Sequence, residues 1–138
     1  MALDVGRKRI GVAISDPSAS FALPVATIER TNRQQVLEEI GELIASYQVD
    51  ELVVGDPVTL SGERGPAAQQ MDAFVEILRT VFPGTIHRMD ERLTTAQATK
   101  SLIAVDVSRR KRRSIVDRMA AALILDAFLA RRRREGGA

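Results

Sequence analysis

The sequence predicts an α/β fold in which a mixed β-sheet carries helices on both faces. Three strand-like segments follow one another at the start of the chain, and strand-like and helix-like segments alternate after them. Successive strands usually pair as antiparallel neighbours, whereas strands separated by helices usually pair in parallel, so both pairings are expected in one sheet. The chain has 138 residues with neither a repeat nor a linker, so we expect a single domain over 1–138.

The first three strand-like segments lie within residues 2–28. Residues 2–5 are apolar except for Asp4, and a tight turn is expected at residues 6–8. Residues 10–15 alternate between large apolar and small side chains, which predicts a strand packed closely on both faces. Residues 24–28 are a weaker strand candidate.

The remaining segments switch between the period of a helix and that of a strand. Apolar residues recur at helical spacing over 33–47, where Asn32 can act as the N-cap, and again over 67–82. The other expected elements are strands over 51–54 and 85–89, a polar loop over 56–66, a helix from Thr94 to about Ile103, and a last helix that begins near Ser114. Between Met119 and Leu129 only Asp126 is polar, so we expect the last helix to be largely buried.

The composition excludes several kinds of chemistry. The chain has no cysteine, which excludes disulfides, thiol nucleophiles and thiolate-bound metals. Its one histidine, His87, excludes metal sites that need two or more histidines, and we expect it to be a structural residue of a strand. No stretch approaches the roughly 20 apolar residues of a membrane span, and no leader opens the chain. We therefore expect a soluble, cytoplasmic protein without a membrane partner, whose chemistry uses carboxylates, hydroxyls, Lys and Arg.

The net charge of +2 hides a strong asymmetry. Residues 1–87 carry 7 Lys and Arg against 12 Asp and Glu, whereas residues 88–138 carry 13 against 6. One basic run comprises Arg109, Arg110, Lys111, Arg112 and Arg113; it is expected on a loop and predicted to bind a polyanion, usually nucleic acid. For the second run, Arg131–Arg134, binding and a solvated, frayed tail remain equally good interpretations.

Three acids are candidates for catalysis by position: Asp4 in the first strand, Glu91 after the fifth strand, and Asp117 in the first turn of the last helix. Each has a plainer interpretation. Asp4 can be a turn acid at a strand end, Glu91 a partner of Arg92, and Asp117 the N3 acid of a capping box. Taken together, they suit a hard divalent cation, because Mg²⁺ in proteins is bound by a few carboxylates and substrate phosphate. Two such ions promote phosphodiester cleavage.

The opening residues 3–16 read LDVGRKRIGVAISD and resemble the signature start of the YqgF/RuvX family. Further matches follow in order, and they cover nearly the whole chain: VVG at 53–55 with Pro57 and Gly62, DERLTT at 90–95, and Asp117 followed by AA at 120–121 and IL at 124–125. Members of this family are assigned to Holliday junction resolution and to maturation of pre-16S ribosomal RNA.

The resemblance implies an RNase H-like fold, with a five-stranded mixed sheet flanked by helices on both faces. It implies that Asp4, Glu91 and Asp117 are the acidic triad, which would bind Mg²⁺ or Mn²⁺. It also implies substrate contacts from Gly6, Lys8, Arg9, Arg92 and Thr94. Gly6 would let the backbone approach phosphate, whereas Lys8 and Arg9 can also be a solvated hairpin tip and Thr94 a helix cap.

The sequence departs from the family pattern at two places. The chain begins only three residues before Asp4, so we expect a first strand that is shorter at its start than is usual for the family. Asp56 stands where an apolar residue is usual. A carboxylate at 56 can extend the acidic site or face solvent, and we expect it to face solvent.

The expected function is a metal-dependent nuclease that acts on structured RNA, branched DNA or both. With 4% aromatic residues, recognition should depend on backbone charge and shape more than on base stacking. A junction resolvase is expected to be a homodimer, because a four-way junction has two symmetric strands to cut. A non-catalytic nucleic-acid-binding accessory module is the main alternative. An actin-like nucleotide-binding protein is a weaker alternative, because that fold needs two lobes.

Overall fold

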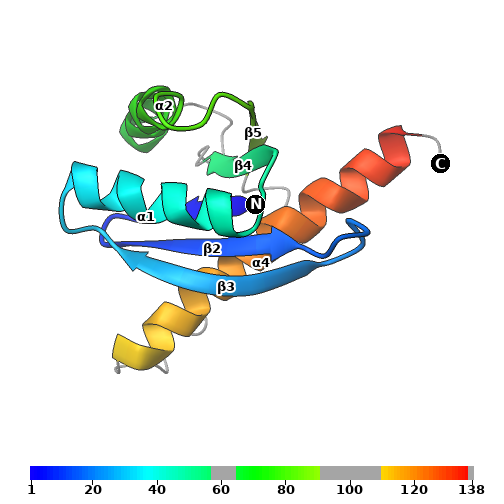
Figure 1. Ribbon diagram of the computed structural model, residues 1–138, viewed down its shortest axis with the longest axis horizontal. Helices are drawn as coiled ribbons and strands as arrows, with labels where there is room; N and C mark the ends of the chain where they lie inside the picture. Colours follow the sequence, from blue (N-terminus) through cyan, green and yellow to red (C-terminus); the bar gives the residue numbers. More distant parts are fainter. Residues whose placement is uncertain (57–64, 91–109, 137–138) are drawn as a thin grey trace.

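The computed structural model describes residues 1–56, 65–90 and 110–136. Figure 1 shows the arrangement of the strands and helices. The strands are β1 (Ala2–Val5), β2 (Arg9–Ser15), β3 (Ala22–Glu29), β4 (Glu51–Asp56) and β5 (Thr85–Asp90). The helices are α1 (Arg33–Ser46), α2 (Pro66–Leu78) and α4 (Arg110–Glu135). The helix expected over 94–103 lies outside the described residues.

The five strands form one mixed sheet in the order β3-β2-β1-β4-β5. β1 pairs antiparallel with β2, and β2 pairs antiparallel with β3. β1 and β4 are parallel, as are β4 and β5. The expected mixed sheet is confirmed, and the carboxyl ends of β1, β4 and β5 meet at one edge.

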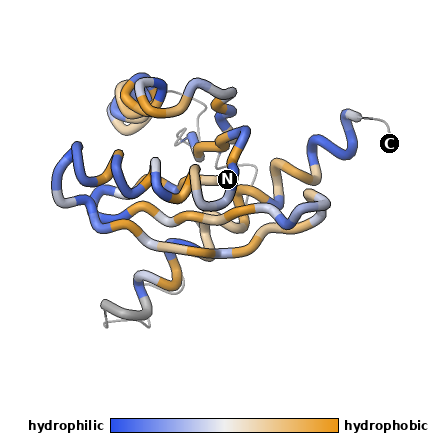
Figure 2. The backbone as a smooth tube through the Cα atoms, in the orientation of Figure 1, coloured by the Kyte–Doolittle hydropathy of each residue, from blue (hydrophilic) through white to orange (hydrophobic). Residues whose placement is uncertain are grey.

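Side chains on the two faces of the sheet belong to two separate cores. Leu3 and Val12 belong to the core that also includes apolar residues of α1 and α2. Ala2 and Ala13 belong to the core under α4. The small side chains on the second face let α4 lie close to β1 and β2, as the alternation of large and small residues predicts. Figure 2 shows the apolar middle of α4 against the sheet and its hydrophilic C-terminal turns.

Helix α1 begins where the sequence predicts. The Asn32 side chain accepts a hydrogen bond from the Gln35 backbone N–H at 2.9 Å, which satisfies one free donor of the first turn. The second helix ends at Leu78, earlier than its apolar stripe suggests. Phe82 is nevertheless 4% exposed, because the turn after α2 returns it to the core.

The last helix is longer than predicted at both ends. It begins at Arg110, so the expectation of a basic loop over 109–113 and a helix start near Ser114 is wrong for residues 110–113. It continues to Glu135, so the interpretation of Arg131–Arg134 as a frayed tail is also wrong. In Figure 1, α4 crosses the sheet obliquely and extends beyond it at both ends. Of the helices in the described ranges, none has the length and apolarity needed to cross a membrane.

Candidate acidic site on the α4 face of the sheet

Asp4 is a buried strand residue with 2% of its surface exposed. It is paired in register with Gly11 of β2, and directly opposed residues of an antiparallel pair point to the same face. Alternation along β1 agrees, because Ala2 belongs to the core under α4 and Leu3 to the opposite core. Asp4 therefore points towards α4 from within β1, and it is not a turn acid.

Helix α4 brings Asp117 to the same face. A Cβ built on Gly11 would lie 1.9 Å from the Asp117 carbonyl oxygen and 2.9 Å from the Arg118 backbone nitrogen. The backbone of α4 therefore rests directly on Gly11, the register partner of Asp4. Asp117 is 7% exposed and lies well inside α4, so its interpretation as the N3 acid of a capping box is wrong.

Arg9 is the cation of this site. Its Nε–H donates to Asp117 Oδ2 at 2.6 Å, and the two side chains are 19% and 10% exposed. Arg9 and Gly11 are two residues apart on β2, so both face α4. The interpretation of Arg9 as part of a solvated hairpin tip is therefore wrong, whereas Arg7 and Lys8 are exposed in the turn.

The turn between β1 and β2 requires Gly6. The Gly6 backbone N–H donates to the Arg9 carbonyl at 2.9 Å, and a Cβ on Gly6 would lie 2.9 Å from the same oxygen. Any larger residue would open this turn. The conformation of this turn therefore determines the positions of Lys8 and Arg9 relative to the end of β1, which carries Asp4.

The remaining predicted site residues are only partly described. Glu91, Arg92, Thr94 and Arg109 lie outside the described residues. Residues 110–113 form the first turn of α4, where Arg113 is exposed. Within the described ranges, no group of three or more His, Asp or Glu side chains gathers as a metal site. Asp4 and Asp117 still supply two buried sets of carboxylate oxygens, which are the ligands of hard divalent cations.

Asp56 contradicts the expectation that it faces solvent. It is the last residue of β4, 8% exposed, and its Oδ1 accepts a hydrogen bond from Arg88 Nη2 at 2.8 Å. Arg88 of β5 also pairs with Asp72 of α2. Because β4 extends one residue past Gly55, Asp56 points to the α2 face, away from Asp4. Arg88 is the sequence signal that could have revealed this pair. It follows Ile86 by two residues in a strand, so it lies on the same face as an apolar residue that packs against the core.

His87 lies in a separate cluster at the other end of α4. Its Nε2 lies 3.0 Å from Glu51 Oε1, and its ring centroid lies 4.8 Å from that of Phe128. Arg132 forms two hydrogen bonds of 2.9 Å with the Glu51 carboxylate and lies over the Phe128 ring. These bonds, first from Arg132 and then from His87, lower the pKa of Glu51 to about 2. Phe128 is about three helical turns from Asp117, so this cluster is separate from the acidic site.

Comparison with known proteins identifies the family. A model of the RuvX family, described as Holliday junction resolvase, matches residues 1–131. Three similar proteins share the curated name "Putative pre-16S rRNA nuclease". That of Roseiflexus sp. is 45% identical over 129 residues, covering 94% of this chain and 92% of the relative. That of Moorella thermoacetica is 43% identical over 136 residues, covering 99% and 97%. That of Desulforudis audaxviator is 42% identical over 133 residues, covering 96% and 94%.

A solved structure agrees at the level of the fold. The structure titled "T. thermophilus RuvC in complex with Holliday junction substrate" matches with a TM-score of 0.51 and 14% sequence identity, covering 94% of this chain and 92% of that chain. The expected RNase H-like fold is therefore confirmed. The names of the relatives confirm the nuclease class at the level of the family. The match over residues 1–131 and the similarity to full-length relatives show that the chain belongs to the RuvX family.

Proposed function

We propose that this protein hydrolyses phosphodiester bonds in structured nucleic acid with a divalent metal ion held by Asp4, Asp117 and Glu91. The observation that carries the proposal is the position of Asp117 above Gly11, the register partner of Asp4. The buried carboxylates of Asp4 and Asp117, which are distant in the sequence, therefore lie on the same face of the sheet, near the end of β1. Burying two carboxylates on one face costs free energy, and a divalent cation bound to both would offset part of that cost.

The two described acids fit a hard divalent cation. Their oxygens are the ligands that Mg²⁺ and Mn²⁺ prefer, and Glu91 would complete the set. When bound, the ion supplies positive charge that favours deprotonation of the attacking water and stabilises the leaving oxygen. Arg9 pairs with Asp117 Oδ2 at 2.6 Å, so a metal ion would either share this carboxylate with the guanidinium or displace it.

Basic residues of the chain would bind the substrate backbone. Lys8 is exposed beside Arg9 in the β1–β2 turn, next to the end of β1. Residues 110–113 place four consecutive cations at the start of the described part of α4. These cations would attract the phosphates of a nucleic-acid backbone. This arrangement suits a polyanion recognised by charge and shape.

We propose precursors of 16S ribosomal RNA as the substrate class. The support is the shared name of relatives that are 42–45% identical over nearly the full chain. This substrate implies a cytoplasmic location. Four-way DNA junctions, named by the family model, are the competing substrate, and cutting both of their strands would require two copies of the chain.

A cleavage panel tests the proposal. Precursor ribosomal RNA, duplex RNA, single-stranded DNA and a four-way DNA junction are incubated with the protein in one salt condition, with Mg²⁺, Mn²⁺ or EDTA. We expect cleavage of the RNA precursor with either metal and none with EDTA. Faster cleavage of the four-way junction than of the RNA precursor would assign branched DNA, and not ribosomal RNA, as the substrate class. Activity unchanged by exhaustive chelation would contradict the mechanism, and binding without cleavage of any substrate would favour the accessory module.

A further inference from the structure

A cavity of about 640 Å³ lies on the face of the sheet opposite α4. It is bounded by the β1–β2 turn, the first turn of α1 and the side of α2. Figure 1 shows that the start of β2 and the start of α1 lie at the same end of the sheet. Its volume is within the range of pockets that bind small organic molecules, about 300–1,000 Å³.

The mouth of the cavity is cationic. Arg7 comes from the β1–β2 turn, Arg30 from the end of β3, and Arg33 from the first turn of α1. No Asp or Glu is among the described residues that line it. Neither Arg7 nor Arg33 forms an ion pair with any carboxylate in the part of the chain that the structure describes. The first turn of α1, a helix of 14 residues, adds its own positive end to these charges. The mouth is therefore complementary to an anion such as phosphate.

The wall of the cavity is apolar and includes one aromatic ring. Val36 of α1 and Met71 and Phe74 of α2 line it. The Arg30 guanidinium lies 5.5 Å from the centroid of the Phe74 ring. Arg30 is held in place because its Nη1 donates to the Gly6 carbonyl at 2.7 Å. An aromatic ring and a fixed guanidinium are the two side-chain groups on which nucleic-acid bases stack.

The cavity adjoins the acidic site through β1. Val5 and Gly6 line the cavity, and Gly6 follows Asp4 by two residues, at most about 7 Å along an extended chain. Val5 packs against the core on the α1 and α2 side, whereas Asp4 faces α4. A nucleic-acid strand that crosses the end of β1 would therefore pass from the acids to the cavity.

We propose that this cavity binds an unpaired nucleotide of the substrate strand, next to the phosphodiester bond that is cleaved. Its base stacks on the platform formed by Phe74 and the Arg30 guanidinium, and its phosphate lies between Arg7 and Arg33. This inference rests on the proposed function. It implies that the nuclease prefers substrates with a single-stranded segment beside the cleavage site. It requires only one aromatic platform, so it is consistent with the low aromatic content of the chain.

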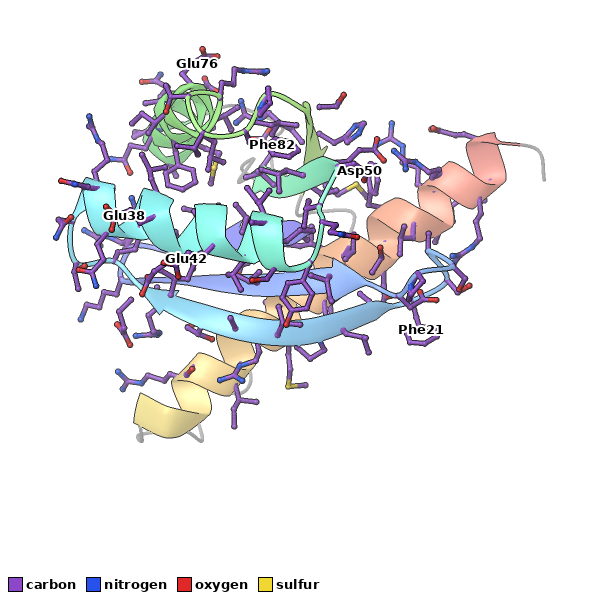
Figure 3. The ribbon with its side chains drawn as sticks, in the orientation of Figure 1. Phe21, Glu38, Glu42, Asp50, Glu76 and Phe82 are labelled. Carbon is purple, nitrogen blue, oxygen red and sulfur yellow. The ribbon has the colours of Figure 1, made fainter. Side chains whose placement is uncertain are left out.

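Binding of a short single strand to the full chain, with EDTA present to prevent cleavage, tests the proposal. The probes are a five-nucleotide oligothymidylate, its uridylate counterpart and an abasic chain with the same number of phosphates. The variants are Phe74→Leu, which removes the ring, and Arg33→Gln, which removes an exposed cation from a helix N-terminus. Arg79→Gln is the matched control, because Arg79 pairs with Glu76, which points away from the sheet in Figure 3.

We expect Phe74→Leu to weaken binding of both base-bearing probes about tenfold and to leave binding of the abasic chain unchanged. Arg33→Gln should weaken binding of all three probes, and Arg79→Gln should change none. In a ¹⁵N-labelled sample, the amide signals of Gly6 and Arg33 should shift on titration.

Equal binding by wild type, Phe74→Leu and Arg33→Gln, with shifts confined to α4, would overturn this inference and leave the proposed nuclease intact. Equal shifts of the Phe74 amide signal with the abasic chain and with the base-bearing probes would overturn the stacking. Absence of binding to any nucleic acid would overturn the proposed function itself.

Discussion

The Asp117 carbonyl oxygen occupies the space beside Gly11 where any other residue would place its Cβ, 1.9 Å from that position. Because Gly11 has no side chain, α4 can lie directly on it, which brings Asp117 close to Asp4, the register partner of Gly11. The contact joins the packing of the last helix to the geometry of the acidic site. Changes at Gly11 should affect stability and activity together.

Gly11→Ala should lower the free energy of unfolding by about 3 kcal/mol, because the added Cβ meets helix backbone, which cannot rotate away. Gly41→Ala is the matched control. A Cβ on Gly41 meets nothing within 4 Å, and alanine in the middle of α1 should raise stability by about 0.5 kcal/mol. Thermal or urea unfolding measures both effects. Equal stability of Gly11→Ala and wild type would contradict the close contact.

Arg9→Gln should destabilise the metal-free protein by about 2 kcal/mol, because it leaves the Asp117 carboxylate without its cation. Adding Asp117→Asn to Arg9→Gln should recover most of this loss, since the uncompensated charge is then removed. Both variants are compared by urea unfolding in EDTA. The exposed pair between Arg79 and Glu76 is the control, and Arg79→Gln should cost no more than about 0.5 kcal/mol. Additive effects at Arg9 and Asp117 would show that the two side chains do not interact.

The sequence predicts the sheet and α1 well because their signals are local. Alternating residues over 10–15 define both faces of β2, and Asn32 marks the start of α1. The start of α4 is not predictable in this way, because the basic run reads as a loop and Ser114 and Asp117 resemble a helix start.

The contacts of the acidic site could be predicted only in part. The resemblance to a family selects Asp4 and Asp117 as site residues, but their shared face depends on how α4 packs on Gly11. That packing depends on strand pairing between distant segments, which local periodicity does not encode. The same applies to Asp56, whose partner Arg88 comes from the neighbouring parallel strand.

Acid should weaken the attachment of the C-terminal half of α4 to the sheet. Hydrogen bonds from Arg132 and His87 lower the pKa of Glu51 to about 2, from 4.5. The stabilisation is therefore complete above pH 4.5 and is lost as the pH falls from 4.5 towards 2. Glu51 is partly exposed, so its contribution is about 1 kcal/mol or less. The thermal midpoint at pH 7 and pH 3 should differ less in Glu51→Gln than in wild type.

Glu42→Gln is the control for this pH dependence, because Glu42 is exposed on α1 and away from α4 (Figure 3). It should retain the wild-type difference between the two pH values. If Glu51→Gln and Glu42→Gln lose stability equally between pH 7 and pH 3, the cluster of Glu51, His87 and Arg132 does not stabilise the protein.

Changing Arg110, Lys111 and Arg112 to Gln should weaken binding of all nucleic-acid sequences similarly and flatten the salt dependence. Each lost phosphate contact should reduce the slope of log K against log salt by about 0.7–0.9. The fold should tolerate the change, because removing cations from a helix N-terminus relieves repulsion with the dipole. Fluorescence anisotropy over a series of salt concentrations measures the slope.

A variant with Arg131, Arg133 and Arg134 changed to Gln is the matched control, because it loses the same charge at the other end of α4 and keeps Arg132 on Glu51. Its salt slope should fall less. An unchanged slope in the variant of residues 110–112 would show that this turn does not bind phosphate.

The most direct test of the acidic site is cleavage by Asp4→Asn, measured beside its affinity for the same substrate in one Mg²⁺ buffer. Asparagine keeps the shape of Asp4 and removes the charge that a divalent ion requires. We predict that cleavage is lost while the Kd changes by less than about threefold, because binding depends on the basic residues. Cleavage by Asp4→Asn at the wild-type rate would contradict the assignment of Asp4 as a metal ligand and with it the proposed mechanism.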